Sequence, residues 1–288
     1  MGTTIWELDF YSRPILDEHQ KKKWEVLVCE SSLDVLRPGD SLFRYAQFCS
    51  NTEVNSVWLR TALEAAIAQA PSPPDKIRFF RRPMKNMITK ACQELGIPAQ
   101  PSRRTFALHQ WLQQRHQDFY PDQPGFRPSP IPTVSFNAIV PKALPDALMG
   151  QKWMFVTLES SAFEEMSEWD MGFSEAFSLE IAGLTPQTRI PGVIIFSPRA
   201  LPLAGWLSGT EMAFLRVDTG PPSGLILETG DSDCWRLVDL TTPAIQAEAK
   251  DFETAKQQAN QVHFLAVQSD PQSESFAGFW LLQELELA

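Results

Sequence analysis

The chain has 288 residues, of which 43% are apolar and 21% charged, a balance typical of a globular protein with a substantial core. No run approaches the ~18 apolar residues of a membrane span, and the start Met-Gly-Thr-Thr-Ile-Trp lacks the features of a secretory signal or transit peptide, so we expect a cytoplasmic protein. The four cysteines lie far apart, which excludes the common zinc and redox motifs, and we expect no metal and no cofactor.

Residues 1–119 form the first predicted domain, in which strands and helices alternate. Aromatic and branched runs at 4–12 and 23–30 predict two strands joined by a polar turn at 17–20. The run 41–50 fits either a strand or a helix, and its assignment stays open. Apolar spacing then predicts helices from residue 56, from Pro83 to Gly96 and over 105–118, with short strands at 76–81 and 97–100.

A proline-rich stretch at 120–150 predicts an extended connector between two domains. Proline lacks an amide donor and restricts φ, so this stretch excludes regular helix and central strand. A short strand at 134–140 stays open. The prolines that define the stretch are Pro121, Pro124, Pro128, Pro130, Pro132, Pro141 and Pro145.

Residues 151–288 form the second predicted domain, which is acidic and rich in strands. One helix is expected at 251–261, where Phe252 and Ala255 begin a helical spacing. A strand hairpin occurs in both halves, at 4–30 and at 213–240, and suggests related folds, although no sequence repeat supports a duplication. Apolar runs predict strands at 153–158, 193–196, 213–217, 224–228, 235–240, 262–267 and 276–282.

The expected fold class is mixed α/β with two domains, both ribonuclease-H-like by analogy. The analogy rests on topology alone, a hairpin of long strands followed by helix, strand, helix and strand. Nucleases of that fold need several carboxylates around metal ions. Asp9 lies in the first strand, where one carboxylate would sit, but the strand at 76–81 ends in Arg81 and Arg82. The nuclease carboxylates are therefore not intact, and we expect no enzyme activity.

The charge of the chain is concentrated in two segments of opposite sign. A formal net charge of −10 would by itself argue against a nucleic-acid partner. Residues 76–116, however, carry nine basic and one acidic residue, whereas residues 153–288 carry six basic and 20 acidic residues. The basic segment is typical of a surface that binds anions.

Two arginine pairs stand directly before predicted helices, Arg81–Arg82 before the helix at 83 and Arg103–Arg104 before the helix at 105. A cation at the positively polarised amino end of a helix is unfavourable by ~0.3–1 kcal/mol, so these positions indicate a bound anion. Free helix amides and guanidiniums together suit a phosphate group. The predicted phosphate contacts are Arg78, Arg81, Arg82, Lys85, Lys90, Arg103 and Arg104.

Aromatic residues are interleaved with these charges. Phe80 and Phe106 are candidates for stacking on the bases of single-stranded RNA, at ~1–3 kcal/mol per base. The competing interpretation places both rings in the protein core. For the arginines, the competing interpretation is intramolecular pairing with the acidic second domain. We favour the anion site, because two doublets at helix starts are hard to explain as scattered ion pairs.

The sequence contains no motif of the common enzyme classes. It has no P-loop, no GxGxxG and no GxSxG, and its four histidines lack metal-ligand spacing. Near its end, an apolar run occurs in an otherwise acidic domain. This run fits a final core strand, or an exposed patch that docks a partner through Trp280, Leu281 and Leu282.

The sequence resembles the chloroplast and cyanobacterial family of translation factors required for the photosystem I reaction-centre subunit PsaB. The matching motifs span most of the chain, and the opening motif is specific to the family. They are WELDFYSRP at 6–14, KWEVLVC at 23–29, FFRRPMKNMI at 79–88, PSRR at 101–104 and the signature WLL at 280–282.

The resemblance implies a non-catalytic factor that binds A/U-rich single-stranded RNA near the 5′ end of a messenger and supports photosystem assembly. Translation factors and photosystem assembly factors are the implied protein partners. Two alternatives stay open. One is a protein-interaction or assembly factor without direct RNA binding, whose basic segment docks on the chain's own acidic half or on a partner. The other is a nuclease remnant around Asp9.

Overall fold

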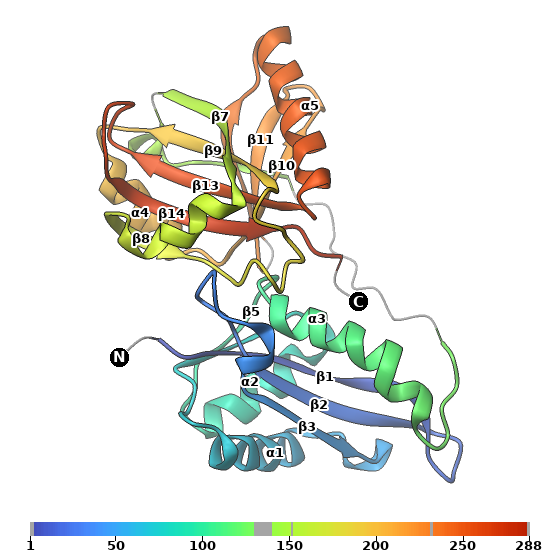
Figure 1. Cartoon of the computed structure of the whole chain (residues 1–288). Helices are drawn as coiled ribbons and strands as arrows, with labels where there is room; N and C mark the ends of the chain where they lie inside the picture. Colours follow the sequence, from blue (N-terminus) through green and yellow to red (C-terminus); the bar gives the residue numbers. More distant parts are fainter. Residues whose placement is uncertain (1–2, 130–139, 151, 231–232, 287–288) are drawn as a thin grey trace. The chain divides into compact units, whose positions relative to one another are not determined.

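The computed structural model describes residues 3–129, 140–150, 152–230 and 233–286 (Figure 1). The chain divides into two compact units. Unit 1 contains residues 3–32, 39–129 and Glu286, and unit 2 contains residues 33–38 and the described residues from 140 to 285. The strand left open at 134–140 falls outside the described residues except for its last position. In the described ranges, no helix combines the length and apolar character needed to cross a membrane.

Unit 1 is built on one mixed sheet with the strand order β3-β2-β1-β4-β5. The first three strands of the chain are antiparallel neighbours, whereas β4 runs parallel to β1 and β5 runs parallel to β4. The segment that fits a strand or a helix forms the edge strand β3. The strands are β1 (Ile5–Leu16), β2 (Lys22–Glu30), β3 (Arg44–Cys49), β4 (Lys76–Phe79) and β5 (Ala99–Pro101).

The helices expected in the first domain are confirmed as α1 (Ser56–Gln69), α2 (Lys85–Glu94) and α3 (Phe106–Gln114). The side chain of Asn55 caps α1 by accepting hydrogen bonds from two backbone amides of its first turn. Gly96 ends α2 with a φ of +72°, a left-handed conformation that glycine adopts without strain. After α3 the chain continues through a π turn at 115–119 and a 3-10 turn at 120–122.

The two faces of the unit 1 sheet differ in chemistry because side chains alternate along each strand. Trp6, Leu8 and Phe10 of β1 enter the apolar core that contains α1 and α2. The residues between them, Glu7 and Asp9, point to the other face and are fully buried as well. Figure 1 shows α3 and α1 on opposite sides of the sheet, so α3 covers this polar face.

The start of the predicted connector belongs to unit 1. The amide of Leu16 donates to the carbonyl of Gly125 at 2.8 Å, and the amide of Arg127 donates to the carbonyl of Pro14 at 2.9 Å. Ile15 and Phe126 form an antiparallel bridge between these two bonds. The chain therefore returns along the end of β1 before it leaves the described residues.

Unit 2 contains two sheets around one apolar core. The first has the order β7-β9-β13-β14-β8, and the second has the order β10-β11-β12-β6. The first sheet comprises β7 (Lys152–Glu159), β8 (Met171–Glu175), β9 (Arg189–Phe196), β13 (Val262–Gln268) and β14 (Phe276–Gln283). The second comprises β6 (Lys142–Ala143), β10 (Met212–Asp218), β11 (Gly224–Thr229) and β12 (Cys234–Asp239).

The mixed α/β fold class and the two-part architecture are confirmed, whereas the ribonuclease-H-like classification stays a prediction. In the strand order of the described residues, unit 2 does not repeat unit 1. In unit 1, the antiparallel strands are β1, β2 and β3, and the parallel strand β4 pairs with the first of them, β1. In unit 2, the antiparallel strands of the second sheet are β10, β11 and β12, and the parallel strand β6 pairs with the last of them, β12. Sequence patterns missed α4 (Ala200–Ser208) because Pro202 and Gly205 interrupt it, and α5 (Pro243–Gln258) begins earlier than expected.

Candidate nucleic-acid interface

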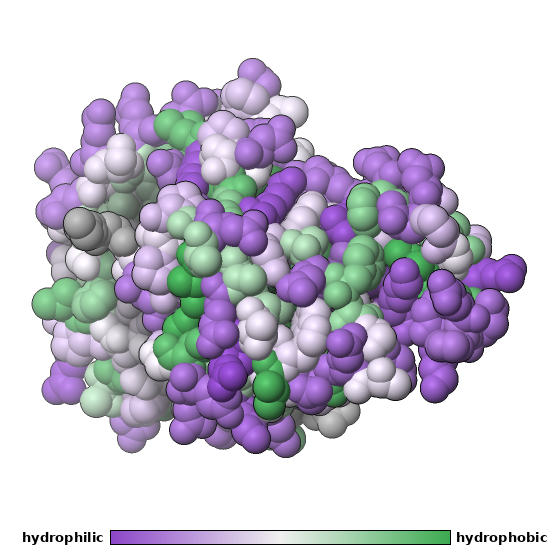
Figure 2. All heavy atoms as spheres, turned by 90° about the horizontal axis from the view of Figure 1, so that it is seen from below, coloured by the Kyte–Doolittle hydropathy of each residue, from purple (hydrophilic) through white to green (hydrophobic). Residues whose placement is uncertain are grey.

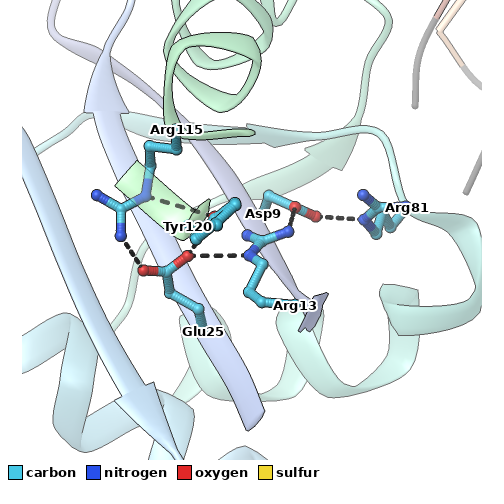
Figure 3. Close-up of polar contacts among 6 residues, drawn as sticks. All are labelled: Asp9, Arg13, Glu25, Arg81, Arg115 and Tyr120. Carbon is cyan, nitrogen blue, oxygen red and sulfur yellow. Dashed lines mark hydrogen bonds and ion pairs between the residues drawn. The ribbon is translucent and has the colours of Figure 1, made fainter. Parts of the chain in front are cut away.

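The polar face of the unit 1 sheet carries a buried network of charged groups, drawn in Figure 3, which we call the buried ion cluster. At its centre, Arg13 Nη1 donates to Asp9 Oδ2 at 2.9 Å, and Arg81 Nε donates to Asp9 Oδ1 at 2.6 Å. Both oxygens of the Asp9 carboxylate are therefore bound by guanidinium groups. The cluster consists of Asp9, Arg13, Glu25, Arg81, Arg115 and Tyr120.

Glu25 on β2 extends the cluster toward α3. Arg13 Nε donates to Glu25 Oε2 at 2.9 Å, and the hydroxyl of Tyr120 donates to the same oxygen at 2.6 Å. Arg115 Nη2 donates to Glu25 Oε1. The π turn after α3 places both Arg115 and Tyr120 against this carboxylate, and π turns of this kind are frequent at functional sites.

Positive charge predominates in the buried ion cluster, which has three guanidiniums and two carboxylates. Burial alone would lower the pKa of Arg13, but Asp9, Tyr120 and Glu25 outweigh burial and raise it. Burial, together with the charges of Arg13 and Arg81, lowers the pKa of His116 to about 4, so this imidazole is neutral at pH 7. The surroundings thus keep Arg13 charged and His116 uncharged.

Glu7 lies on the same face of β1, outside the cluster. Its carboxylate accepts a hydrogen bond from the Ser31 hydroxyl at 2.7 Å and another from the amide of Leu108, in the first turn of α3, at 2.7 Å. Burial raises the pKa of Glu7 from 4.5 to about 7, although both hydrogen bonds and the charges of Arg78 and Arg104 act in the opposite direction. Glu7 therefore titrates near neutral pH.

The arginine doublets do not form one exposed patch. Arg81 is 3% exposed, its guanidinium binds Asp9, and it packs over the rings of Tyr11 and Phe80 at 4.0 and 4.9 Å from the ring centres. The guanidinium of Arg81, which the sequence predicts to contact a phosphate, is therefore bound to the carboxylate of Asp9 in this structure. Physically, a buried carboxylate needs a paired cation, and Arg81 at the end of β4 supplies it.

The other predicted phosphate contacts are divided between the interior and the surface. Arg78, Arg103 and Arg104 are buried, and Arg82 is half-buried. Lys85 and Lys90 on α2 are exposed. The predicted set therefore leaves chiefly lysines, rather than guanidinium pairs, at the surface.

The predicted aromatic contacts lie in the interior. Phe80 is 2% and Phe106 is 6% exposed, and the guanidinium of Arg104 packs over the ring of Phe106 at 5.5 Å from its centre. Their rings are therefore covered by protein, as the core interpretation expects, and are not presented to bases.

The apolar triplet at 280–282 lies in the second half of β14. Trp280, Leu281 and Leu282 are each at most 2% exposed, and Trp280 and Leu282 belong to the core of unit 2. The triplet accordingly fits the final core strand and does not form an exposed docking patch, because β14 pairs with β13 on one side and with β8 on the other.

Sequence reasoning missed several residues of the polar face, namely Glu7, Arg13, Glu25, Arg115 and Tyr120. A signal was available in the strands. Ionisable residues at alternate positions of otherwise apolar strands indicate a sheet face with buried charge, and β1 and β2 carry that pattern. Within the described ranges, no group of three or more histidine, cysteine, aspartate or glutamate side chains is placed to hold a metal ion.

Removing the Glu25 charge should destabilise the protein strongly. Glu25→Gln removes the buried carboxylate that pairs with Arg115 and leaves Arg13 paired with Asp9 alone, and we expect a loss of about 3–5 kcal/mol of unfolding free energy. The control is Glu64→Gln, because Glu64 makes an exposed ion pair with Arg60 at 3.6 Å, for which we expect a loss below about 1 kcal/mol. Urea titration measures both, and equal small losses would contradict a structural role for the cluster.

Glu7 should make stability decrease as pH rises. Its folded-state pKa of about 7 lies above the ordinary 4.5, so the folded state retains a proton that the unfolded state releases. The contribution of Glu7 to the free energy of unfolding is therefore fully present below pH 4.5, and it decreases by roughly 1.4 kcal/mol per pH unit up to pH 7. Glu7→Gln mimics the protonated acid. We expect the unfolding free energy of Glu7→Gln minus that of the original chain to increase by about 3 kcal/mol between pH 4.5 and 8. A difference that stays constant over this range would refute the raised pKa of Glu7.

Comparison with known proteins places both halves of the chain in one family. Residues 5–115 match the N-terminal domain of the RNA-binding proteins Tab2/Atab2, and residues 131–283 match the C-terminal domain of the same proteins. The chain is 40% identical over 289 residues to a chloroplastic TAB2 homologue of Arabidopsis thaliana, covering 97% of this chain and 74% of the relative. A chloroplastic TAB2 homologue of Zea mays is also 40% identical, over 287 residues that cover 97% of this chain and 71% of the relative. The chain therefore belongs to the Tab2/Atab2 family of RNA-binding proteins.

Proposed function

We propose that this protein binds A/U-rich single-stranded RNA and thereby supports translation of photosystem I reaction-centre subunits and photosystem assembly. The observation that carries the RNA part is the match of both halves of the chain to domains of RNA-binding proteins. The messenger and the A/U preference come from the sequence resemblance. A cytoplasmic location stays a prediction, because both relatives are named as chloroplastic.

Within the predicted contact set, the surface of α2 and the turn before it are the favoured phosphate contacts. Lys85 and Lys90 are exposed, and Arg82 is half-buried. Lysine binds phosphate as a mobile point charge, which suits a flexible single strand without base-specific geometry. These three side chains would supply affinity, whereas the buried arginines would hold the fold that presents them.

A second function has one specific observation in its favour. If the protein were an interaction or assembly factor without direct RNA binding, its arginine doublets would contact carboxylates. Arg81 does so, through its bond to Asp9. Translation factors and photosystem assembly factors are the partners that this alternative proposes.

We further propose that the protein acts without catalysis. Both oxygens of the Asp9 carboxylate accept hydrogen bonds from guanidiniums, which leaves this group poorly placed to share a metal ion.

RNA binding should be electrostatic and should weaken along the α2 surface when charge is removed. Each phosphate contact to a single strand contributes roughly 0.7 to the slope of log affinity against log salt concentration. The triple variant Arg82→Ala, Lys85→Ala, Lys90→Ala should lower that slope by about 2, measured by fluorescence anisotropy with an A/U-rich strand of about 20 nucleotides.

Two controls define the outcome of this titration. The matched charge control is Lys152→Ala, Arg199→Ala, Lys250→Ala, which removes three exposed cations of unit 2. A C-rich strand of equal length tests the A/U preference and should bind more weakly. Absence of binding by the original chain would sink direct RNA binding and leave the alternative function.

Labelled RNA should stay intact during incubation with the protein. We expect no cleavage with Mg²⁺ or Mn²⁺, because Asp9 is engaged by Arg13 and Arg81. Denaturing electrophoresis over several hours measures it, with the Asp9→Asn variant as the comparison. Metal-dependent cleavage by the original chain that disappears in the variant would establish a nuclease and overturn the proposal.

A further inference from the structure

Most cations of unit 1 are engaged within the protein. The guanidiniums of the buried ion cluster bind carboxylates, and Arg60 pairs with Glu64 on α1 and Glu94 on α2. Within unit 1, by contrast, no hydrogen bond or ion pair to a described residue holds the side chains of Lys22, Lys23, Lys90 and Arg127. Three of these four residues, Lys22, Lys23 and Arg127, lie near the turn end of the β1–β2 hairpin.

The backbone brings these three residues together from distant parts of the sequence. Lys22 is paired with Leu16 across the hairpin, and the amide of Leu16 donates to the carbonyl of Gly125 on its other side. Arg127 follows on the same returning segment. Since neighbouring strands lie about 4.8 Å apart, the backbones of Lys22 and Gly125 are separated by about two strand spacings. We call residues 17–23 and 124–127 the hairpin tip.

The acidic residues at the hairpin tip do not neutralise its lysines. The Asp17 carboxylate accepts hydrogen bonds from the amides of His19 and Lys21 at 2.8 and 2.9 Å, so it stabilises the turn itself. These contacts lower the pKa of Asp17 and keep it ionised, with Lys21 as the nearby cation. Glu18 is exposed and forms no ion pair within the described residues. Four cations of the tip thus face two acids.

The hairpin tip also has a concave surface. A pocket of about 510 Å³ lies between the turn and the returning segment, lined among others by His19, Lys23, Pro124 and Gly125. This volume falls within the roughly 300–1,000 Å³ typical of small-ligand sites. Figure 2 shows one face of the molecule, on which hydrophilic residues cover much of the surface.

We propose that the hairpin tip is a contact site for the phosphate backbone of single-stranded RNA, with Lys22, Lys23 and Arg127 as the contacting residues. The inference rests on the proposed function and adds a site outside the basic segment 76–116. Its physical reason is that a cation already paired to a carboxylate gains little from a phosphate, whereas an unpaired surface cation releases counter-ions from the RNA on binding.

The experiment is the same salt titration with the full chain and the A/U-rich strand. The triple variant Lys22→Ala, Lys23→Ala, Arg127→Ala should lower the slope by about 2 and the affinity at 0.1 M salt by about 100-fold. The unit 2 triple variant Lys152→Ala, Arg199→Ala, Lys250→Ala again removes two lysines and one arginine and should leave both quantities unchanged. A variant with Lys22→Arg and Lys23→Arg keeps the charge and should bind like the original chain.

The outcomes separate this site from the proposed function. If the original chain binds RNA and the hairpin-tip variant binds it with equal slope and affinity, the site is wrong and the proposed function stands. If the original chain does not bind RNA, both are wrong. Equal thermal unfolding of the hairpin-tip and unit 2 variants excludes misfolding as the cause of a loss. Ultraviolet crosslinking gives an independent readout, and crosslinked peptides that include residues 17–24 would support the site.

Discussion

The pairing of Asp9 with two guanidiniums is the interaction on which the rest of unit 1 depends. A carboxylate in the middle of a buried strand is costly unless cations and hydrogen bonds compensate for its lost hydration. Arg13 comes from the same strand and Arg81 from the end of β4, so the bond joins the hairpin to the parallel part of the sheet. Glu25 repeats the arrangement one strand away and ties it to the segment after α3. Ion pairs therefore stabilise the polar face of the sheet, whereas apolar packing stabilises the opposite face.

This arrangement separates two roles that a basic segment can have. The nine cations of residues 76–116 are close in sequence, but the fold sends some of them inward and leaves others at the surface. Arg81 and Arg115 neutralise buried carboxylates. Lys85 and Lys90 remain exposed, and the unpaired cations of the hairpin tip lie outside the segment altogether. Charge density along the sequence is therefore an incomplete guide to charge at the surface.

Much of the fold followed from the sequence, because it depends on local patterns. Apolar spacing identified the start of α1 at residue 56, and Gly96 identified the end of α2. The buried ion cluster did not follow, because its hydrogen-bonded partners lie up to 95 residues apart and meet only through the sheet register and the π turn. Helix α4 escaped detection because Pro202 interrupts its pattern near the start. The sequence marks the arginine doublet at 81–82 as the neighbour of an anion. In the structure, the anion that Arg81 binds is the carboxylate of Asp9, and no sequence pattern tells whether such an arginine binds a carboxylate of the protein or a phosphate.

The return of the chain along β1 has a consequence for how the N-terminal half is isolated. The N-terminal family match ends at residue 115, which is also the first residue of the π turn. A fragment cut there would lose Tyr120, one of the hydrogen-bond donors to Glu25, and would expose the backbone of Leu16 that Gly125 covers. An autonomous N-terminal half has to extend through Arg127, so the physical boundary of the first domain lies inside the proline-rich stretch.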